Sequence, residues 1–478
     1  MPLDRFIASR KPVKRGFFPE SSDSAPPRLP EIGAANENVL TIVDQYPHKG
    51  IDTLDESLEI VPVTTPLNGS VRPPGSKSLT NRALICAALA NGSSTLSGAL
   101  DSEDTQVMVS ALQSLGISIA ADWAGATLEV DGCEGLVPAR KAALNLEGSG
   151  TSIRFLTALA ATGKGLFTLD GNERMRQRPI GELTDALRKC QTDIKSHGGF
   201  PPIIVQANRL AGGTVAIRGD ISSQYLSALL LAAPAATDAM EFYIEGPQVS
   251  EPYIEMTRTV MHAFGVEVEQ PDATHFRVVP QSYMNQNFAI EPDASAASYF
   301  WAAAAITGGR VRVEGLNSSS LQGDVAFCNC LQKMGCAVEE DATGMTVSGK
   351  KLSGIDVDMS AISDTVQTLA TVALFAEGAT TIRGVGHIRH KESDRIGDLA
   401  RELRKLGATI QETTDGLCIH PGPLQAARIE TYNDHRMAMS LAVAGLHSPG
   451  LQIKDPGCTA KTYPGFFRDL ENLASAAR

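Results

Sequence analysis

The fold is decided by the stretch Pro74-Gly75-Ser76-Lys77-Ser78-Leu79-Thr80-Asn81-Arg82 and by the apolar run over 83–90 that follows it. Pro and Gly break the preceding structure, the hydroxyl residues offer an N-cap, and the Ala- and Leu-rich run propagates a helix. Lys77, Ser78 and Arg82 therefore lie on or beside the first turn, where free N–H groups and the helix dipole favour an anion. A capped helix with solvated cations would give the same pattern. Repetition of the pattern along the chain decides between an anion-binding site and a plain capped helix.

Length and charge restrict the class of protein. The 478 residues carry a formal net charge of −12, with 43% hydrophobic and 20% charged residues. This length predicts two or three domains of a soluble globular protein. The apolar runs are shorter than the ~20 residues that a membrane-spanning helix needs. Because the acidic balance disfavours binding driven by phosphate charge, we expect no nucleic-acid and no membrane partner. An acidic protein that binds anions must gather its cations in one place.

The cysteines and the N-terminal residues point to the cellular setting. Eight cysteines are scattered along the chain without the paired spacing of a zinc site, so we expect reduced, mostly buried thiols in a cytoplasmic protein. Residues 1–55 have basic pairs, then Ser- and Pro-rich sequence, and no apolar segment of a secretory signal. A transit peptide would explain the basic start, but the acidic residues soon after argue against it. We expect a disordered extension.

One pattern recurs with a period of roughly 70 residues. A polar opening leads into an Ala-rich helix, then a Gly-containing turn, then a short strand. The predicted helices are Asn81–Ala90, Ser152–Ala161, Ser223–Ala233, Ala296–Ile306, Thr365–Ala376 and His435–Gly445. The predicted strands are Thr95–Gly98, Leu166–Gly171, Glu241–Gly246, Arg310–Gly315, Thr380–Val385 and Leu451–Pro456. These helices are apolar on nearly every side, which predicts that they are buried.

Amphipathic helices follow most of these strands and end at a Gly C-cap. They are Asp104–Gly116, Pro252–Gly265, Asp324–Gly335 and Glu392–Gly407. Six such α/β units are too many for one compact domain, so we expect two domains of three units each. The last unit ends at Arg478 without its strands, and a strand over Leu58–Val63, with Gly69–Arg72, could complete it. The domains would then be 56–75 with 291–478, and 76–290, with crossings near Gly75 and Glu291.

The polar openings of the units bring similar residues to the same end of each buried helix. They contain Ser76-Lys77-Ser78, Gly148-Ser149-Gly150-Thr151 with Arg154, Ser222-Ser223-Gln224, Asp293-Ala294-Ser295, Ser363-Asp364 and Asn433-Asp434-His435-Arg436. Such helix ends, facing one cleft, would bind a multiply anionic ligand. These residue types are also ordinary N-caps. Caps alone do not require the cations Lys77, Arg82, Arg154 and Arg436.

Further cations follow the strands on the same side. They occur in Arg174-Met175-Arg176-Gln177-Arg178-Pro179, in Arg389-His390-Lys391-Glu392-Ser393-Asp394-Arg395, and at Lys461. A single charge run is usually a solvated surface. Their occurrence at equivalent points of a repeat favours a site, and Arg offers the two-pronged donor set that suits carboxylate and phosphate.

At these residues the sequence resembles the 5-enolpyruvylshikimate-3-phosphate synthase family of enolpyruvyl transferases, from about Leu58 to the C-terminus. The resemblance is carried by the motifs at 74–82, 174–180, 222–224 and 391–395, and by Asn433-Asp434-His435-Arg436-Met437-Ala438-Met439. It implies a two-domain inside-out α/β barrel of six quasi-repeated units. It also implies transfer of the enolpyruvyl group of phosphoenolpyruvate to the 5-hydroxyl of shikimate 3-phosphate by a monomer that closes on its substrates. No metal or organic cofactor is implied.

The resemblance also assigns residues to the two substrates. Phosphoenolpyruvate would be held by Lys77, Gly150, Arg154, Arg178, Gln224, Arg395, Arg436 and Lys461, with Thr151 on the same side. Shikimate 3-phosphate would be held by Ser78, Arg82, Ser222, Ser223, Gln224, Ser250, Tyr253, Asp364, His387 and Lys391. Asp364 would take the proton of the attacking hydroxyl and Glu392 would move the proton of the methylene carbon. The reverse assignment, and a part for Lys77, stay open.

Three departures from the family pattern affect binding detail. Many relatives have Asn in the loop that here reads Glu147-Gly148-Ser149-Gly150, His387 stands where Asn is frequent, and Phe155 replaces a Pro of some relatives. The small residue Gly150 is associated with sensitivity to glyphosate, which competes for the phosphoenolpyruvate site, so we expect sensitivity.

Three other functions fit parts of the pattern. A related enolpyruvyl transferase acts on a uridine-diphosphate sugar, but its Cys-bearing loop is missing from Arg174–Pro179. A non-catalytic anion-binding protein would not need Asp364 and Glu392 beside its cations. A fold relative that acts on RNA ends is disfavoured by the net charge.

Overall fold

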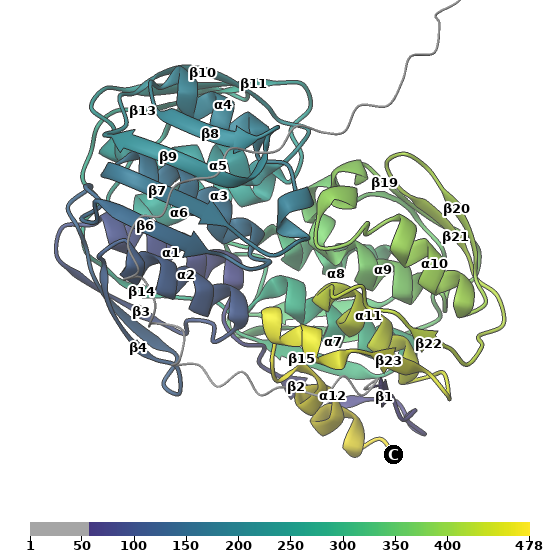
Figure 1. Ribbon diagram of the computed structural model, residues 1–478. Coiled ribbons are helices and arrows are strands. Elements are labelled where there is room, and N and C mark those ends of the chain that lie inside the picture. The colour runs from purple at the N-terminus through teal and green to yellow at the C-terminus, as the bar shows by residue number, and fades with distance from the viewer. Residues whose placement is uncertain (1–56) are drawn as a thin grey trace, which may run out of the picture. The chain divides into compact units, whose positions relative to one another are not determined.

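The computed structural model describes residues 57–478, which form a mixed α/β structure (Figure 1). The extension that we expect over residues 1–55 lies outside the described residues. Within 57–478, no helix combines the length and the apolar character that crossing a membrane requires.

The strands of the described residues form six small open sheets. Three of them lie between residues 93 and 289, and three combine the first two strands with residues 310–454. The first three sheets, in strand order, are β14 (Asn287–Ala289), β3 (Ser93–Ser97), β5 (Thr127–Asp131), β4 (Ser118–Asp122); β6 (Lys141–Asn145), β7 (Lys164–Asp170), β9 (Phe200–Asn208), β8 (Asp193–His197); and β10 (Gly213–Arg218), β11 (Met240–Glu245), β13 (His275–Val278), β12 (Glu269–Asp272). The others are β16 (Ala337–Asp341), β17 (Gly344–Ser348), β15 (Arg310–Glu314), β2 (Asn68–Val71); β18 (Asp356–Asp358), β19 (Thr380–Arg383), β21 (Leu417–His420), β20 (Thr409–Glu412); and β1 (Ser57–Glu59), β23 (Gln452–Lys454), β22 (Arg428–Ile429). None of these sheets closes into a barrel, so the inside-out barrel stays a prediction.

The Ala-rich helices form where the sequence predicts them. They are α1 (Lys77–Leu89), α3 (Gly150–Ala161), α5 (Ser223–Ala232), α7 (Ala294–Thr307), α9 (Val366–Ala373) and α11 (His435–Gly445). Every residue of α3 and α11 is buried. Burial on all sides explains why their sequences lack a polar face.

The helices with a polar face are α2 (Glu103–Ser114), α4 (Gly181–Lys189), α6 (Glu251–Ala263), α8 (Phe327–Lys333), α10 (Gly397–Lys405) and α12 (Phe466–Ser475). The prediction was wrong at the start of α10, placed at Glu392. The Asp394 carboxylate accepts from the backbone N–H groups of Ile396 and Gly397 at 3.1 and 3.0 Å. This local turn competes with helix formation, so residues 391–395 stay outside the helix.

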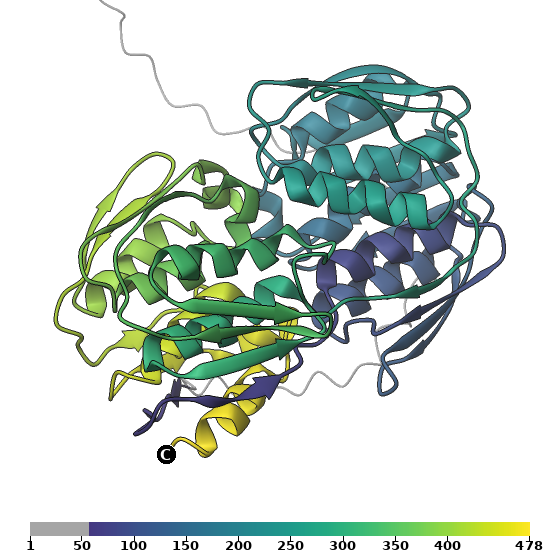
Figure 2. The same ribbon diagram turned by 180° about the vertical axis from the view of Figure 1, so that it is seen from behind.

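Two hydrophobic cores hold these elements. One is built from residues between Leu79 and Ile290, and the other from Ile60, Leu67 and residues between Ala294 and Ala477. Figures 1 and 2 show the sheet β6–β7–β9–β8 on one side of α3 and α5, with α6 on the other. The domain limits that we expect from the sequence stay a prediction.

The segments at the expected crossings lie side by side. Gly75 pairs with Pro292 in an antiparallel bridge, and the Ser76 N–H donates to the Glu291 carbonyl at 2.8 Å. A Cβ at Gly75 would lie 1.9 Å from the Gly98 carbonyl oxygen, so only glycine fits. Strand β1 pairs with β23, so an N-terminal strand joins the sheet at the end of the chain, while the division into repeated units stays a prediction. Strand β2 pairs instead with β15.

Candidate functional site

The first turn of α1 places a lysine against a buried carboxylate. The Ser76 side chain caps the helix, accepting from the Leu79 N–H at 3.4 Å. Lys77 follows as the first helical residue, and its Nζ lies 3.2 Å from Asp104 Oδ2. The Lys461 Nζ donates to the other oxygen of Asp104 at 2.8 Å and to the Gly148 carbonyl at 2.8 Å. Burial raises the pKa of Asp104, but Lys461 and Lys77 reverse this and leave it below its usual value.

Arg82 is buried one turn further along α1. Its guanidinium donates to Thr257 Oγ1 at 2.8 Å and to the carbonyls of Ser78 and Tyr253 at 2.9 and 3.1 Å. Burial lowers the pKa of Arg82 to about 10, because no carboxylate pairs with it among these contacts. The side chain therefore brings a desolvated positive charge beside Ser78.

A second group of cations surrounds Glu392. Arg395 Nη2 lies 2.8 Å and Arg178 Nη1 3.4 Å from the Glu392 carboxylate. Arg395 is held from behind by Asp434, which accepts from its Nε and Nη2 at 2.8 and 3.1 Å. Burial raises the pKa of Glu392, but Arg395 and Arg178 outweigh it and leave the pKa well below its usual value. Glu392 is therefore ionised at neutral pH.

Asp364 is a half-buried carboxylate in a similar cationic setting. It pairs with Arg436 Nη2 at 2.8 Å, Arg395 Nη1 at 3.2 Å and Lys391 Nζ at 3.7 Å. Burial acts to raise the pKa of Asp364, and these cations, with a contribution from Lys77, lower it well below its usual value. Because Arg395 contacts both Glu392 and Asp364, the two carboxylates belong to one network.

The loop before α3 is packed against Arg178. A Cβ at Gly150 would lie 2.5–2.7 Å from the Arg178 guanidinium, so any larger residue must displace that cation. Arg154 donates to the Gly150 and Pro179 carbonyls at 2.8 and 3.0 Å. Gly148 stands where many relatives have Asn, so that side-chain contact is absent from this loop. The neighbouring Ser149 hydroxyl is buried and lies 2.7 Å from Ser152 Oγ.

Hydroxyl residues predicted to bind shikimate 3-phosphate lie near His387 and at the start of α5. Ser250 Oγ lies 3.4 Å from His387 Nε2, which contacts Ser363 Oγ at 3.1 Å. Burial and then Lys391 lower the pKa of His387 to about 4, so the ring is neutral. Ser222 caps α5, with Ser223 as the first helical residue, and Gln224 donates to Thr151 Oγ1 at 3.4 Å. A neutral His387 can replace the hydrogen bond of an Asn but adds no charge.

Three residues of this network are absent from the site residues that the sequence predicts. Asp104 joins Lys77 to Lys461, and Asp324 accepts from the Tyr253 hydroxyl at 2.9 Å. Arg174 donates to the carbonyls of Glu392 and Lys391 at 3.0 and 2.9 Å. Arg174 lies within a motif that the sequence singles out. Asp104 and Asp324 occur at helix starts, where an acidic residue is expected for capping alone. The sequence therefore does not distinguish a capping residue from a residue of the site at these positions.

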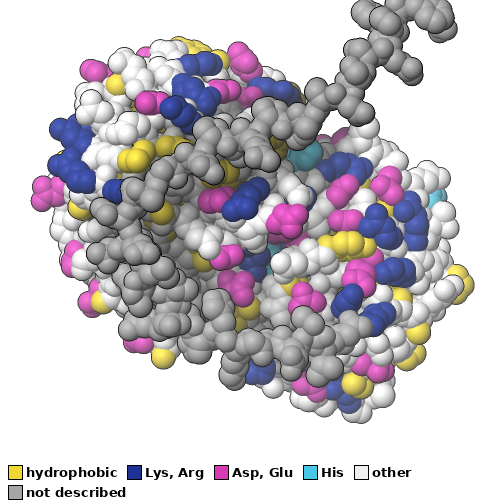
Figure 3. Space-filling model, viewed as in Figure 1, with side chains coloured by type: hydrophobic (Ala, Val, Ile, Leu, Met, Phe, Trp, Pro, Cys, Tyr) yellow, Lys and Arg dark blue, Asp and Glu magenta, His cyan; other side chains and the backbone are white. Residues whose placement is uncertain are grey.

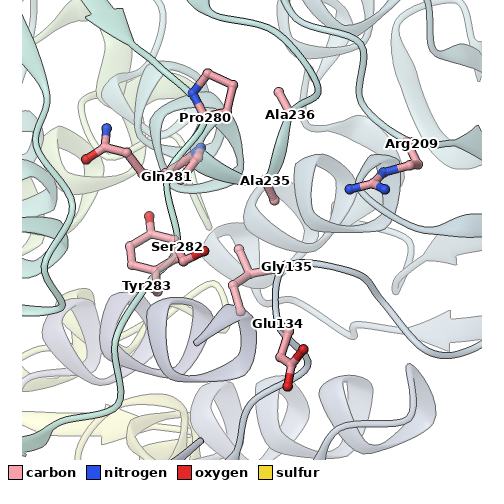
Figure 4. Close-up of a pocket in the computed structure, with 11 residues that line it drawn as sticks. Glu134, Gly135, Arg209, Ala235, Ala236, Pro280, Gln281, Ser282 and Tyr283 are labelled. Atoms are coloured by element: carbon pink, nitrogen blue, oxygen red, sulfur yellow. The ribbon is translucent and has the colours of Figure 1, made fainter. Parts of the chain in front are cut away.

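One small cavity borders part of this network. A cavity of about 20 Å³ is bounded by Arg154, Arg178, Ser222, Gln224, His387 and Lys391, among others. Another cavity, of about 290 Å³, lies elsewhere, between Leu89 at the end of α1 and Ala235 beyond the end of α5 (Figure 4). This cavity lies at the C-terminal ends of α1 and α5, whereas Lys77 and Ser223 lie at their N-terminal ends. On the face shown in Figure 3, Lys and Arg are interspersed with Asp and Glu.

Nothing in residues 57–478 gathers three or more His, Cys, Asp or Glu side chains in an arrangement that could hold a metal ion. The eight cysteines are free, and six of them are buried. The carboxylates of the site contact cationic side chains instead, so the network is organised for anions.

Comparison with known proteins agrees with this arrangement. The family model described as EPSP synthase (3-phosphoshikimate 1-carboxyvinyltransferase) matches residues 61–470. The chain belongs to the EPSP synthase family. A 3-phosphoshikimate 1-carboxyvinyltransferase of Nostoc punctiforme is 48% identical over 416 residues, covering 86% of this chain and 98% of the relative. One of Shewanella baltica is 42% identical over 424 residues, covering 87% and 99%.

A solved structure also belongs to this comparison. The EPSP synthase of Acinetobacter baumannii superposes with a TM-score of 0.73 at 26% identity, covering 88% of this chain and 98% of that chain. The chain and this EPSP synthase thus share their fold over most of the chain.

Proposed function

We propose that the protein transfers the enolpyruvyl group of phosphoenolpyruvate to the 5-hydroxyl of shikimate 3-phosphate and releases phosphate. The observation that carries this proposal is that five cations, Lys77, Arg178, Arg395, Arg436 and Lys461, pair with the carboxylates of Asp104, Glu392 and Asp364. The Gly148 carbonyl accepts from both Lys461 and Arg178 and so joins the Asp104 pairs to the others. Two phosphorylated acids repel one another, and buried cations offset that repulsion. The relatives that carry the name 3-phosphoshikimate 1-carboxyvinyltransferase support this substrate pair.

The resemblance to the family assigns the binding roles. Lys77, Arg178, Arg395, Arg436 and Lys461, with Gly150, Arg154 and Gln224, form the phosphoenolpyruvate side. Ser78, Arg82, Ser222, Ser223, Ser250, Tyr253, His387 and Lys391 form the shikimate 3-phosphate side. Asp364 contacts cations of both sets, which supports a role for it between the two substrates.

The reaction is an addition followed by an elimination. The 5-hydroxyl oxygen bonds to the central carbon of phosphoenolpyruvate, losing its proton, while the methylene carbon gains a proton and becomes a methyl group. Phosphate then leaves the central carbon and the methyl group loses a proton. Asp364, ionised beside Arg436, is suited to accept the hydroxyl proton. Glu392 is suited to deliver and remove the carbon-bound proton once a bound anion competes for Arg395 and Arg178.

Substrate entry involves movement, because the Lys461–Asp104 and Arg178–Glu392 pairs join side chains of residues 291–478 to side chains of residues 76–290. We infer two domains, 56–75 with 291–478 and 76–290, each of three repeated units around its buried helices. The paired segments at Gly75 and Pro292 would serve as the hinge. Opening would break the Lys461–Asp104 and Arg178–Glu392 pairs, and closure on substrate would exclude water. The site is complete within one chain, so a monomer suffices, and free thiols fit a cytoplasmic location.

Release of inorganic phosphate, measured by a coupled assay, tests the proposal. We expect phosphate from phosphoenolpyruvate only when shikimate 3-phosphate is present. Phosphate release with a uridine-diphosphate amino sugar in its place would assign the chain to the other kind of enolpyruvyl transferase. No release with either acceptor would leave an anion-binding protein.

A further inference from the structure

The buried carboxylate of Asp324 has no part in the reaction as described above. It lies in the short helix η3 (Gly323–Ala326) and is 3% exposed. Its Oδ2 accepts hydrogen bonds from the hydroxyls of Ser295 and Tyr253. Its Oδ1 is buried without a hydrogen-bond partner among the described residues. A buried carboxylate paired only with hydroxyls is costly to keep ionised.

The Tyr253 hydroxyl stands between Asp324 and Asp364. Its oxygen lies 2.9 Å from Asp324 Oδ2 and 3.3 Å from Asp364 Oδ2. Burial raises the pKa of Tyr253 well above its usual value, so the hydroxyl keeps its hydrogen. Because it has a single hydrogen, Tyr253 can donate to only one of the two carboxylates at a time.

The surroundings of the two carboxylates differ in charge. Asp364 faces Arg436, Arg395 and Lys391, which keep it ionised. Asp324 faces Asp364, Ser295, Arg436 and Tyr253 from the four neighbouring elements. Burial and then Asp364 raise the pKa of Asp324 to about 6, against the opposing effects of Ser295, Arg436 and Tyr253. Asp324 is therefore the member of the pair that changes charge near neutral pH.

We propose that Asp324 is a positioning residue that controls the basicity of Asp364 through the direction of the Tyr253 hydroxyl. Ionised Asp324 accepts the Tyr253 hydrogen, and Asp364 keeps its lone pairs for the substrate hydroxyl. Asp324 protonated on Oδ2 donates to the Tyr253 oxygen, and Tyr253 then donates to Asp364, which weakens it as a base. One proton taken up from solvent forms the O–H bond on Asp324 Oδ2 and returns to solvent on ionisation. No other covalent bond is made or broken, and the Tyr253 hydroxyl only turns. This inference rests on the proposed function.

The kinetic consequence is an acid limb in kcat/KM for shikimate 3-phosphate. One pH unit below its midpoint the contribution of Asp324 lowers kcat/KM about tenfold. The substrate phosphates titrate in the same range, so variants are compared with the wild type. In Asp324→Asn the group cannot ionise, and we expect the profile to lose one ionisation while that of the substrate remains.

Ser295 and Ser298 give a matched pair of tests on α7. The Ser295 hydroxyl donates to Asp324 and favours its ionised form. Ser295→Ala should move the acid midpoint upward by about 0.5–1 pH unit. Ser298 is also buried but contacts the Ser295 carbonyl and Thr368 Oγ1. Ser298→Ala should leave the midpoint unchanged. If Asp324→Asn does not fold, the comparison of these two serine variants tests the role of Asp324.

A second measurement follows the charge of Asp324 without turnover. Its folded pKa lies above the model-peptide value of 3.8, so ionisation at higher pH opposes folding. Relative to Asp324→Asn, the wild type should lose thermal stability as the pH rises from about 4 through 6. An acid limb in Asp324→Asn identical to that of the wild type would overturn this inference and leave the proposed function standing. An equal shift of the acid midpoint in Ser295→Ala and Ser298→Ala would do the same. Absence of turnover at every pH would overturn the proposed function as well.

Discussion

Lys461 Nζ lies 2.8 Å from Asp104 Oδ1, although 357 positions separate the two residues in the sequence. The same carboxylate lies 3.2 Å from Lys77 Nζ. One buried negative charge therefore holds together two lysines, one at the first turn of α1 and the other near the C-terminus. Asp104 contributes electrostatic stability that a bound anion can replace.

Asp104→Asn tests this contact. Removing the charge leaves two largely buried ammonium groups unpaired, and we expect the free energy of unfolding to fall by about 3 kcal/mol. Phosphoenolpyruvate with shikimate 3-phosphate should stabilise this variant more than the wild type, because the bound anions supply the missing charge. Thermal denaturation with and without ligands measures both effects. Asp170→Asn, which breaks an exposed pair with Arg176, is the control, and an equally small loss in both variants would contradict the account.

Glu392→Gln separates binding from chemistry. The amide keeps the size of the side chain beside Arg395 and Arg178 but cannot carry a proton to carbon, so we expect kcat to fall about 10²–10⁴-fold. Dissociation constants measured by equilibrium binding should change little. Unchanged turnover would remove Glu392 from the mechanism, and Glu412→Gln, on the exposed strand β20, provides a control.

The sequence predicts the buried helices and the cations well, because both follow local rules. An Ala-rich run after a capping Ser specifies α1, and a cation at its first turn is visible without a structure. The start of α10 is not predictable in this way, since Asp394 diverts the chain into a turn. Asp104 and Asp324 are missed for a related reason. Their partners, Lys461 and Tyr253, are distant in sequence, and only the packed fold brings them within hydrogen-bond distance.

Gly150→Ala tests the contact with Arg178. The added methyl group would lie 2.5–2.7 Å from the guanidinium and must displace it. We expect the KM for phosphoenolpyruvate to rise and inhibition by glyphosate to weaken by at least about tenfold, equivalent to ~1.4 kcal/mol. Steady-state inhibition assays give both constants. Gly181→Ala, whose methyl group would meet its nearest neighbour at 3.4 Å, should change neither, and an unchanged glyphosate constant in Gly150→Ala would refute the prediction.

Binding of the two substrates should be accompanied by proton uptake. In the free protein the cations around Asp364 and Glu392 hold both pKa values well below normal. A bound anion competes for these cations, so both pKa values rise and protons are taken up at mildly acidic pH. Calorimetric titrations in buffers of high and low ionisation enthalpy should give different apparent enthalpies in the direction of uptake. Equal enthalpies, or proton release, would show that the ligands bind elsewhere.

The central claim is that this network carries out addition followed by elimination at the vinyl group. Running the reaction in deuterium oxide tests it directly, since the methylene carbon becomes a methyl group that takes one hydrogen from the solvent. The account predicts deuterium in the methylene group of the enolpyruvyl product, detected by mass spectrometry, and little product from Glu392→Gln. Product formed at the wild-type rate without any deuterium would contradict it.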